Sequence, residues 1–352
     1  MRARVVAALL VTPLAALALT TPAAQAYPDP KLTITKVELN KSSVAVSSLN
    51  TVPVKLTVTG GYNSTDPQDA NLTLHAFLRR TAGTGMANLL ISTELVRKTG
   101  DTQHGTWEGN VNVPSTANGT LEVSGVMTGA YTSIDTGDMT TETPAPNPPK
   151  LTVIGTNQPK ITARVLPDPV PFGQGYSIRW SVINAQTAKP YGTRLKVWLA
   201  DDNGCVENFG GPAVLTDTNG YLTKSYPASA SDYGNCLLLP GDPAPVGGTN
   251  VHVNHPGIVS ATPSKTSAPV GAIVPVNGTV AGAPTGCPVN LQRLYGATAW
   301  RNVGTAKVRQ ASGKFVLNAQ PAYKGNIPYR VSFPACANFK AGVSKAFTIR
   351  GT

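Results

Sequence analysis

Short runs that alternate between apolar and polar residues recur along the whole chain. Examples are KLTVT, NLTLHAFL, YSIRWSV, RLKVWLA, KFVLNA and YRVSF. Such alternation is typical of strands that bury one face. The 30 prolines and 34 glycines interrupt every stretch long enough for a helix. Many short strands, separated by turn signals about every ten residues, predict an all-β chain built of sandwiches or barrels.

A turn, a strand and a proline follow one another in the same order at three places. The three segments are GTWEGNVNVPS (105–115), NGYLTKSYPAS (219–229) and SGKFVLNAQPA (312–322). The glycine step suits a tight turn with positive φ, and the proline ends strand pairing because it has no N–H to donate. In the third copy, alternation directs Phe315, Leu317 and Ala319 toward a core. Three copies predict three sandwich domains in a row.

Composition shifts place the boundaries of these domains. The proline-rich stretch 143–150 is typical of a linker. However, LTVIG (151–155) could be the last strand of the first domain, in which case the linker is TNQPK. A second boundary falls within 252–265. The predicted divisions are a signal peptide at 1–26 and sandwich domains at 27–155, 156–254 and 255–352.

The first 26 residues have the three parts of a secretory signal. Arg2 and Arg4 precede an apolar run, and Ala24-Gln25-Ala26 supplies the small residues of a cleavage site. A membrane anchor is the alternative, but the run is short and contains Pro13. No later segment approaches the roughly 20 apolar residues of a membrane span. We therefore expect a secreted, extracellular protein that does not span a membrane.

The four cysteines predict two disulfides. An even number in an exported chain favours bridges, and no CxxC spacing supports a metal site instead. In 156–254, Cys205 follows the expected third strand and Cys236 begins the sixth; in 255–352, Cys287 begins the third strand and Cys336 follows the sixth. If the third and sixth strands are antiparallel neighbours, both pairs come within bonding range, at opposite ends of the strand pair.

The stretch from 259 to 350 resembles the immunoglobulin-like or fibronectin-III-like modules of exported proteins from high-GC Gram-positive bacteria. The residues that carry the resemblance are VNGTV, PVNLQRLYGATAWRNVGTAKV, SGKF and YRVSF. The second domain is similar but less typical, and the first is a looser match. The resemblance implies a fold and almost no function. It gives Tyr329, at the start of the sixth strand, the role of a tyrosine corner.

Signals of catalysis and metal binding are weak. The chain has no GxSxG motif, and its cysteines are assigned to bridges. We expect no catalytic residues, no metal and no cofactor. His75 is interpreted as an exposed strand residue, and His252 and His255 form an HxxH outside a helix. Two polar groups suggest calcium-binding loops but fit turns better: Asp201, Asp202 and Asn203, and separately Asp217 and Asn219. The four tryptophans, Trp107, Trp180, Trp198 and Trp300, are expected in hydrophobic cores.

Positive charge is concentrated in the last domain. The net charge is +11, yet residues 27–155 hold nine Lys/Arg and eleven Asp/Glu, and residues 156–254 hold seven of each. Residues 255–352 hold eleven Lys/Arg and no acid. Natural surfaces normally mix both signs, so this field indicates a polyanionic partner or, alternatively, serves solubility. The candidate basic face comprises Arg293, Lys307, Arg309, Lys314, Arg330 and Arg350.

These features favour a secreted, non-catalytic protein that binds an anionic surface, such as cell-wall polymer or acidic polysaccharide, through its third domain. Nucleic acid is not expected, because the chain is exported and has no nucleic-acid-reading motif. One alternative is a protein-binding or inhibitor module that acts through loops at a sandwich end, such as Asp201–Gly204, with an unknown protein partner. Another is a secreted enzyme.

Overall fold

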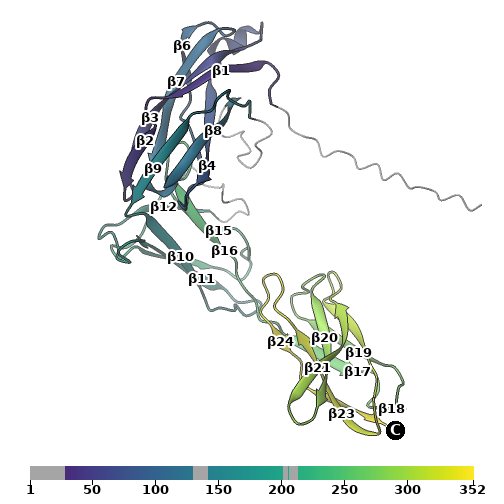
Figure 1. Cartoon of the computed structure of the whole chain (residues 1–352). Helices are drawn as coiled ribbons and strands as arrows, with labels where there is room; N and C mark the ends of the chain where they lie inside the picture. The colour runs from purple at the N-terminus through teal and green to yellow at the C-terminus, as the bar shows by residue number, and fades with distance from the viewer. Residues whose placement is uncertain (1–27, 130–141, 201–204, 206–212) are drawn as a thin grey trace, which may run out of the picture.

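The computed structural model describes residues 28–129, 142–200, 205 and 213–352, and the proposed signal peptide lies outside this part of the chain. Strands make up nearly all the regular structure described (Figure 1). Only two short 3-10 turns, η1 (Pro67–Asn71) and η2 (Ser115–Ala117), interrupt them. The predicted all-β fold is therefore confirmed.

Two sheets near the amino terminus share one hydrophobic core, and we call them the amino-terminal sandwich. Their facing side chains include Leu56, Leu78, Trp107 and Leu121, all fully buried. The Trp107 indole N–H also donates to the Leu72 carbonyl, 3.0 Å away. The sheet orders are β1 (Leu32–Leu39), β3 (Thr51–Tyr62), β7 (Gly105–Pro114), β6 (Val96–Gly100); and β2 (Ser43–Ser47), β9 (Lys150–Thr156), β8 (Gly119–Thr128), β4 (Leu74–Ala82), β5 (Leu89–Ile91).

The next two sheets form the middle sandwich around Ile178, Trp180, Val197 and Leu237. Because β9 pairs with β8 and β2, the segment 151–155 is a strand of the amino-terminal sandwich, as the sequence allowed. The orders in the middle sandwich are β10 (Pro159–Leu166), β11 (Tyr176–Asn184), β14 (Tyr221–Tyr226); and β13 (Val214–Leu215), β12 (Lys196–Ala200), β15 (Asn235–Leu239), β16 (Gly247–Val251).

The last two sheets form the carboxy-terminal sandwich, whose core holds Phe315, Leu317, Tyr329 and Phe333. One sheet is β17 (Val259–Pro263), β19 (Val274–Val280), β22 (Lys314–Ala319). The other is β18 (Ser267–Ala268), β25 (Phe347–Gly351), β23 (Gly325–Phe333), β20 (Pro288–Tyr295), β21 (Ala299–Lys307), with β24 (Gly342–Val343) also paired to β23. Strand β21 therefore has one neighbour and forms an edge.

The repeated turn–strand–proline segments lie where the sequence placed them. Gly220 and Gly313 have positive φ, at 78° and 64°. In the first of these turns, the Asp217 carboxylate accepts the N–H of Tyr221 at 2.7 Å. Along β22, Phe315, Leu317 and Ala319 are buried and the residues between them are exposed. The glycine therefore closes the turn, and alternation sets which face packs.

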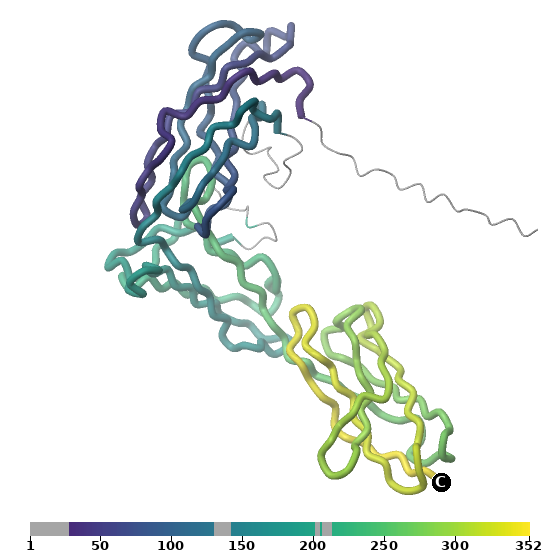
Figure 2. Tube along the Cα trace, viewed as in Figure 1, coloured from purple at the N-terminus to yellow at the C-terminus, as the bar shows by residue number. Residues whose placement is uncertain are grey.

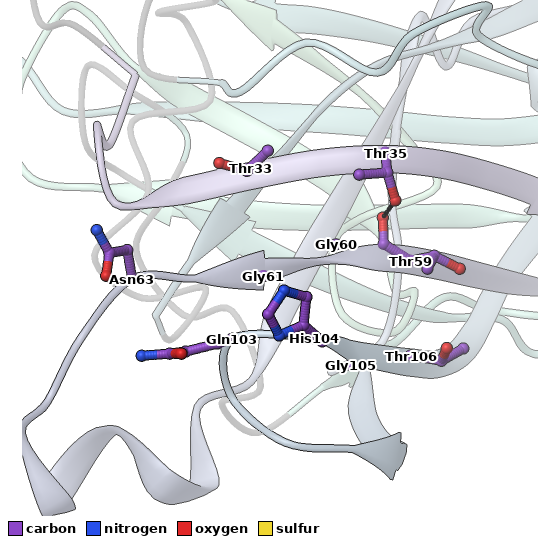
Figure 3. A pocket seen from close by; sticks show the side chains of 10 residues that line it. All are labelled: Thr33, Thr35, Thr59, Gly60, Gly61, Asn63, Gln103, His104, Gly105 and Thr106. Atoms are coloured by element: carbon purple, nitrogen blue, oxygen red, sulfur yellow. Dashed lines mark hydrogen bonds between the residues drawn. The ribbon is translucent and has the colours of Figure 1, made fainter.

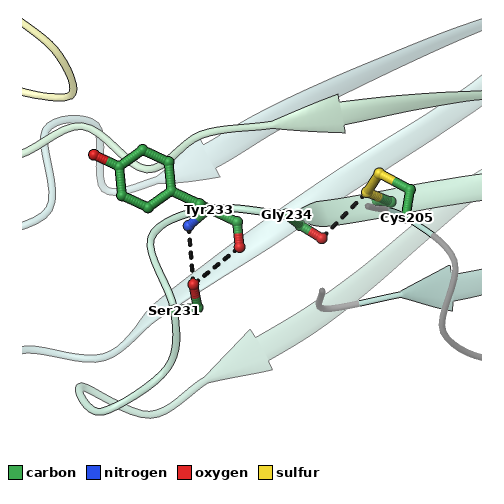
Figure 4. The surroundings of a disulfide bond; sticks show 5 residues. Cys205, Ser231, Tyr233 and Gly234 are labelled. Carbon is green, nitrogen blue, oxygen red and sulfur yellow. Dashed lines mark hydrogen bonds between the residues drawn. A yellow bond between two sulfur atoms is a disulfide. The ribbon is translucent and has the colours of Figure 1, made fainter. Parts of the chain in front are cut away.

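Both predicted disulfides form, and each closes within its own sandwich. Strand β12 pairs antiparallel with β15, and β20 pairs antiparallel with β23. The Cα atoms are 5.7 Å apart in Cys205–Cys236 and 6.0 Å apart in Cys287–Cys336. Figure 4 shows the first bridge, where the Cys236 sulfur lies 3.1 Å from the Gly234 carbonyl. The predicted pairing of third and sixth strands is confirmed.

The prediction that His75 is exposed is wrong. Its side chain is buried, and Nδ1 lies 3.1 Å from the Ser92 carbonyl. Leu74 and Ala76 face the core, and His75 points to the opposite face of β4, which is covered as well. The Ser92 hydroxyl accepts the N–H of Ala76, and Glu142 lies against the same sheet, where it accepts a hydrogen bond from Arg79. Alternation separates two faces of a strand but does not say whether the second face meets solvent.

The middle and carboxy-terminal sandwiches follow each other end to end (Figure 2), and His255 contacts the middle sandwich at their boundary. The His255 Nδ1 atom lies 2.8 Å from the Val170 carbonyl, and Nε2 lies 2.9 Å from Asp232 Oδ2. The Phe172 ring stacks on the imidazole at 4.8 Å between centroids. Lys340 also forms an ion pair with Asp168 across this boundary, at 3.6 Å. The contact is therefore made by specific polar and aromatic side chains from both sandwiches.

Candidate functional site

The candidate site is the cationic surface of the carboxy-terminal sandwich. All of residues 255–352 lie in the described part of the chain, and they contain no Asp or Glu. Two of their side chains, His255 and Lys340, lie within ion-pair distance of Asp232 and Asp168, and both acids belong to the middle sandwich. No carboxylate of the sandwich itself can therefore neutralise its lysines and arginines.

The structure distributes the six predicted basic residues over several surfaces. Along β23, Arg330 lies between buried Tyr329 and Val331, so it points to the outer face of the larger sheet. Exposed Arg350 and Lys307 lie on the same sheet, in β25 and β21. The predicted outward orientation is confirmed for these residues.

The other three basic residues lie elsewhere. Lys314 is exposed on the outer face of the smaller sheet, next to buried Phe315. Arg309 is exposed in the turn between β21 and β22, where its N–H donates to the Lys314 carbonyl. Arg293 points to the other face of the larger sheet, because it alternates with Gln292 along β20 and pairs in register with buried Tyr329. The charge therefore surrounds the sandwich rather than forming one basic face.

Arg330 lies over an aromatic ring. Its guanidinium carbon is 4.4 Å from the Trp300 ring, and its Nε donates to the Gln292 side chain at 2.7 Å. Gln292 in turn donates to Asn302 at 3.0 Å. Trp300 is only half-buried, so its predicted core position is wrong. It lies on edge strand β21, whose single neighbour leaves its side chains exposed. The predicted burial of Trp107, Trp180 and Trp198 is confirmed.

A second cluster of arginine and aromatic side chains lies where β20 joins β21. Arg293 and Arg301 are 4.4 Å and 4.9 Å from the ring of the same tyrosine, Tyr295. Arg293 also donates to the Tyr295 hydroxyl. Arg301, Tyr295 and the exposed side of Trp300 were not among the predicted site residues. The segment LQRLYGATAWR contains the signal, because two arginines and two aromatic residues lie within one hairpin.

Two hollows lie away from these arginines. One, of about 380 Å³, is at the boundary of the middle and carboxy-terminal sandwiches, between Asp232, Asn338 and Phe339. The other, of about 510 Å³, lies on the outer face of the amino-terminal sandwich (Figure 3). Its lining contains no Asp, Glu, Lys or Arg. It consists of Thr33, Thr35, Thr59, Gly60, Gly61, Asn63, Gln103, His104, Gly105 and Thr106.

The remaining candidates from the sequence have structural partners or lie outside the described residues. Asp217 caps its turn, and His255 contacts Asp232. The loop Asp201–Gly204 is not described. Among the described residues, no three His, Cys, Asp or Glu side chains are placed to hold a metal ion. Within the same residues, no helix has the length and apolar content that a membrane span requires.

Comparisons of sequence find nothing similar: no protein family matches the chain, and no curated protein matches it either. Comparisons of structure find immunoglobulin-like chains. One is Dpr2 Ig1-Ig2 in complex with DIP-Theta Ig1-Ig3, at 8% identity and a TM-score of 0.20, covering 90% of this chain and 98% of that one. The sheets themselves define an all-β fold of sandwiches.

Two larger proteins are also similar over most of the chain. Dimeric latent PorU from Porphyromonas gingivalis matches at 12% identity and a TM-score of 0.24, covering 92% of this chain and 34% of that one. Escherichia coli alpha-2-macroglobulin activated by porcine elastase matches at 10% identity and a TM-score of 0.20, covering 90% of this chain and 32% of that one. The chain therefore spans about a third of the length of these two proteins.

Proposed function

We propose that this protein is exported and binds an anionic polymer, such as cell-wall polymer or acidic polysaccharide, through its carboxy-terminal sandwich. In this proposal residues 27–155, 156–254 and 255–352 are three domains, and the protein acts by binding rather than by catalysis. The observation that carries the proposal is the sequence of 255–352, with eleven Lys/Arg and no acid.

The placement of these cations supports the proposal. Lys307, Lys314 and Arg350 are exposed on three different strands. A sandwich surrounded by one sign of charge attracts an extended polymer from many directions and speeds its association. The two disulfides are consistent with an oxidising, extracellular compartment.

The test is binding of the intact chain to poly-L-glutamate, with neutral dextran as the control polymer. Salt is raised from about 50 mM to about 500 mM, because the screening length falls severalfold over this range. We expect binding to poly-L-glutamate that weakens steeply with salt, and no binding to dextran. Binding that does not change with salt, or equal binding to both polymers, would contradict the proposal.

A further inference from the structure

Two arginines lie directly opposite each other at one end of the carboxy-terminal sandwich. In the register of β20 and β21, Arg293 pairs with Arg301, next to the pair of Tyr295 with Ala299. Like charges in opposed cross-strand positions destabilise a sheet. No acid in 255–352 is available to relieve the repulsion. The chain therefore maintains two unneutralised guanidinium groups at neighbouring positions.

The Tyr295 ring holds both groups in place. Their guanidinium carbons lie 4.4 Å and 4.9 Å from its centroid. Stacking on a ring uses the flat face of a guanidinium, whereas its five N–H donors point outward in the plane. Arg293 donates to the Tyr295 hydroxyl and also hydrogen-bonds the Tyr329 hydroxyl. The remaining in-plane donors of the two arginines have no partner in the described contacts, although both side chains are oriented.

The cluster rests on a rigid base. Arg293 also pairs in register with Tyr329, which is fully buried and donates its hydroxyl to the Gln320 carbonyl at 2.8 Å. Burial raises the pKa of the Tyr329 hydroxyl, while the nearby Arg293 charge acts in the opposite direction. The hydroxyl bond is of the tyrosine-corner kind that the sequence resemblance implied. The arginines therefore project from a packed strand pair instead of a loose loop.

The cluster lies at the end of the sandwich that faces away from the rest of the chain. Strand β20 begins beside Cys287, whose bridge to Cys336 lies near the middle sandwich, and it ends at Tyr295. Figure 2 shows that the β20–β21 hairpin reaches the same end as the carboxy terminus. Exposed Tyr323, in the connection between β22 and β23, also belongs to this end, because its carbonyl lies against Gly351. A long polymer can reach this end without contact with the other sandwiches.

We propose that Arg293 and Arg301, oriented by Tyr295, form an oxyanion-binding site that takes a carboxylate or phosphate group of an anionic polymer. A planar guanidinium recognises such a group through two parallel N–H donors, which a lysine ammonium cannot reproduce. The site rests on the proposed function and refines it. The general field of the sandwich attracts the polymer, and this pair of arginines makes the oriented contact.

The experiment separates geometry from charge by exchanging arginine for lysine in the intact chain. The test variant is Arg293→Lys with Arg301→Lys, and the matched control is Arg164→Lys with Arg179→Lys, two exposed arginines that also lie opposite each other, on β10 and β11 of the middle sandwich. Both variants keep the net charge. Affinity is measured by calorimetry for poly-L-glutamate, which offers carboxylates, and for inorganic polyphosphate, which offers phosphates. A third variant, Tyr295→Leu, removes the ring that orients the arginines.

We expect the test variant to bind one or both polymers about tenfold more weakly, because hydrogen bonds to charged groups are lost. The control should stay within about twofold of the parent chain, and Tyr295→Leu should lower affinity with both arginines present. The polymer with the larger loss identifies the preferred oxyanion. Equal affinities in all variants, with binding that still weakens with salt, would overturn the site and leave the proposed function intact. Absence of binding by the parent chain would overturn both.

Discussion

The amino-terminal and carboxy-terminal sandwiches share a fold but neutralise their cations differently. In the first, lysines pair with carboxylates: Lys55 lies 2.9 Å from Glu108, and Lys150 lies 3.3 Å from Glu122. In the last, arginines lie over aromatic rings, as Arg330 does over Trp300. The first sandwich has no cysteine, and the last is closed by a disulfide.

The difference concerns charge more than stability. A carboxylate cancels the charge of its partner, so an ion pair adds little to the distant field. An aromatic ring attracts a cation through its quadrupole but carries no net charge. The carboxy-terminal sandwich therefore orders its arginines without neutralising them. One fold can in this way present either a mixed surface or a strongly positive one.

The largest effect is expected in the amino-terminal sandwich, at the ion pair between Arg79 and Glu142. The Glu142 side chain is only 3% exposed, and Ser124 also donates to it. Arg79→Ala leaves this carboxylate buried without its counter-ion, which should lower the free energy of unfolding by about 3–5 kcal/mol. Urea denaturation measures the change.

Lys150→Ala is the control for Arg79→Ala. Its ion pair with Glu122 is exposed on the lysine side, so we expect a loss of about 0–1 kcal/mol. Similar losses in the two variants would show that the Arg79 pair is no more important than a surface pair.

The second largest effect is expected for the Cys287–Cys336 bridge. It joins residues 49 positions apart, and its removal by Cys287→Ser with Cys336→Ser should destabilise the carboxy-terminal sandwich by about 2–4 kcal/mol. Calorimetry of the intact chain with and without reductant measures the change. The unfolding of the amino-terminal sandwich serves as the internal control, because it has no cysteine. A transition of that sandwich that moved equally with reductant would contradict the comparison.

The smallest effect is expected where an aromatic ring replaces the carboxylate. Arg330→Ala should lower the free energy of unfolding by about 0.5–1 kcal/mol, the usual contribution of an exposed cation–π contact. The control is Arg350→Ala, which removes a cation of the same sheet for which the structure shows no ring contact. Thermal unfolding of both variants measures the difference. A loss of several kcal/mol at Arg330 would mean that the ring contact supports the fold as strongly as a buried ion pair.

Local patterns predicted much of this architecture. Period-two alternation placed the strands, glycine marked the turns, and the position of each cysteine relative to its strand predicted both bridges. The uneven charge is a property of the sequence itself. These features depend on neighbours along the chain or on one pair of adjacent strands. They can therefore be predicted without knowing which distant segments contact each other.

The features that the sequence did not predict depend on distant contacts. His75 is buried because Ser92 and the segment at Glu142 cover the second face of its sheet. Arg293 faces away from Arg330 because β20 and β23 pair in the register of Gln292 with Arg330 and Arg293 with Tyr329, which the sequence of β20 alone does not give. The stacking of Arg330 on Trp300 joins β23 to β21 across an intervening strand. Strand register and the segments that cover a second face decided these positions.

The central claim is that Lys307, Lys314 and Arg350 of the carboxy-terminal sandwich have no carboxylate partner among the described residues, whereas Lys36, Lys55 and Lys150 of the amino-terminal sandwich do. The most direct test compares two triple variants of the intact chain, Lys307→Gln/Lys314→Gln/Arg350→Gln and Lys36→Gln/Lys55→Gln/Lys150→Gln. Each lowers the net charge by three, and only the second set removes ion-paired lysines. We predict that the first set lowers the affinity for poly-L-glutamate about tenfold and the second less than about twofold. Equal losses in both sets would contradict the account.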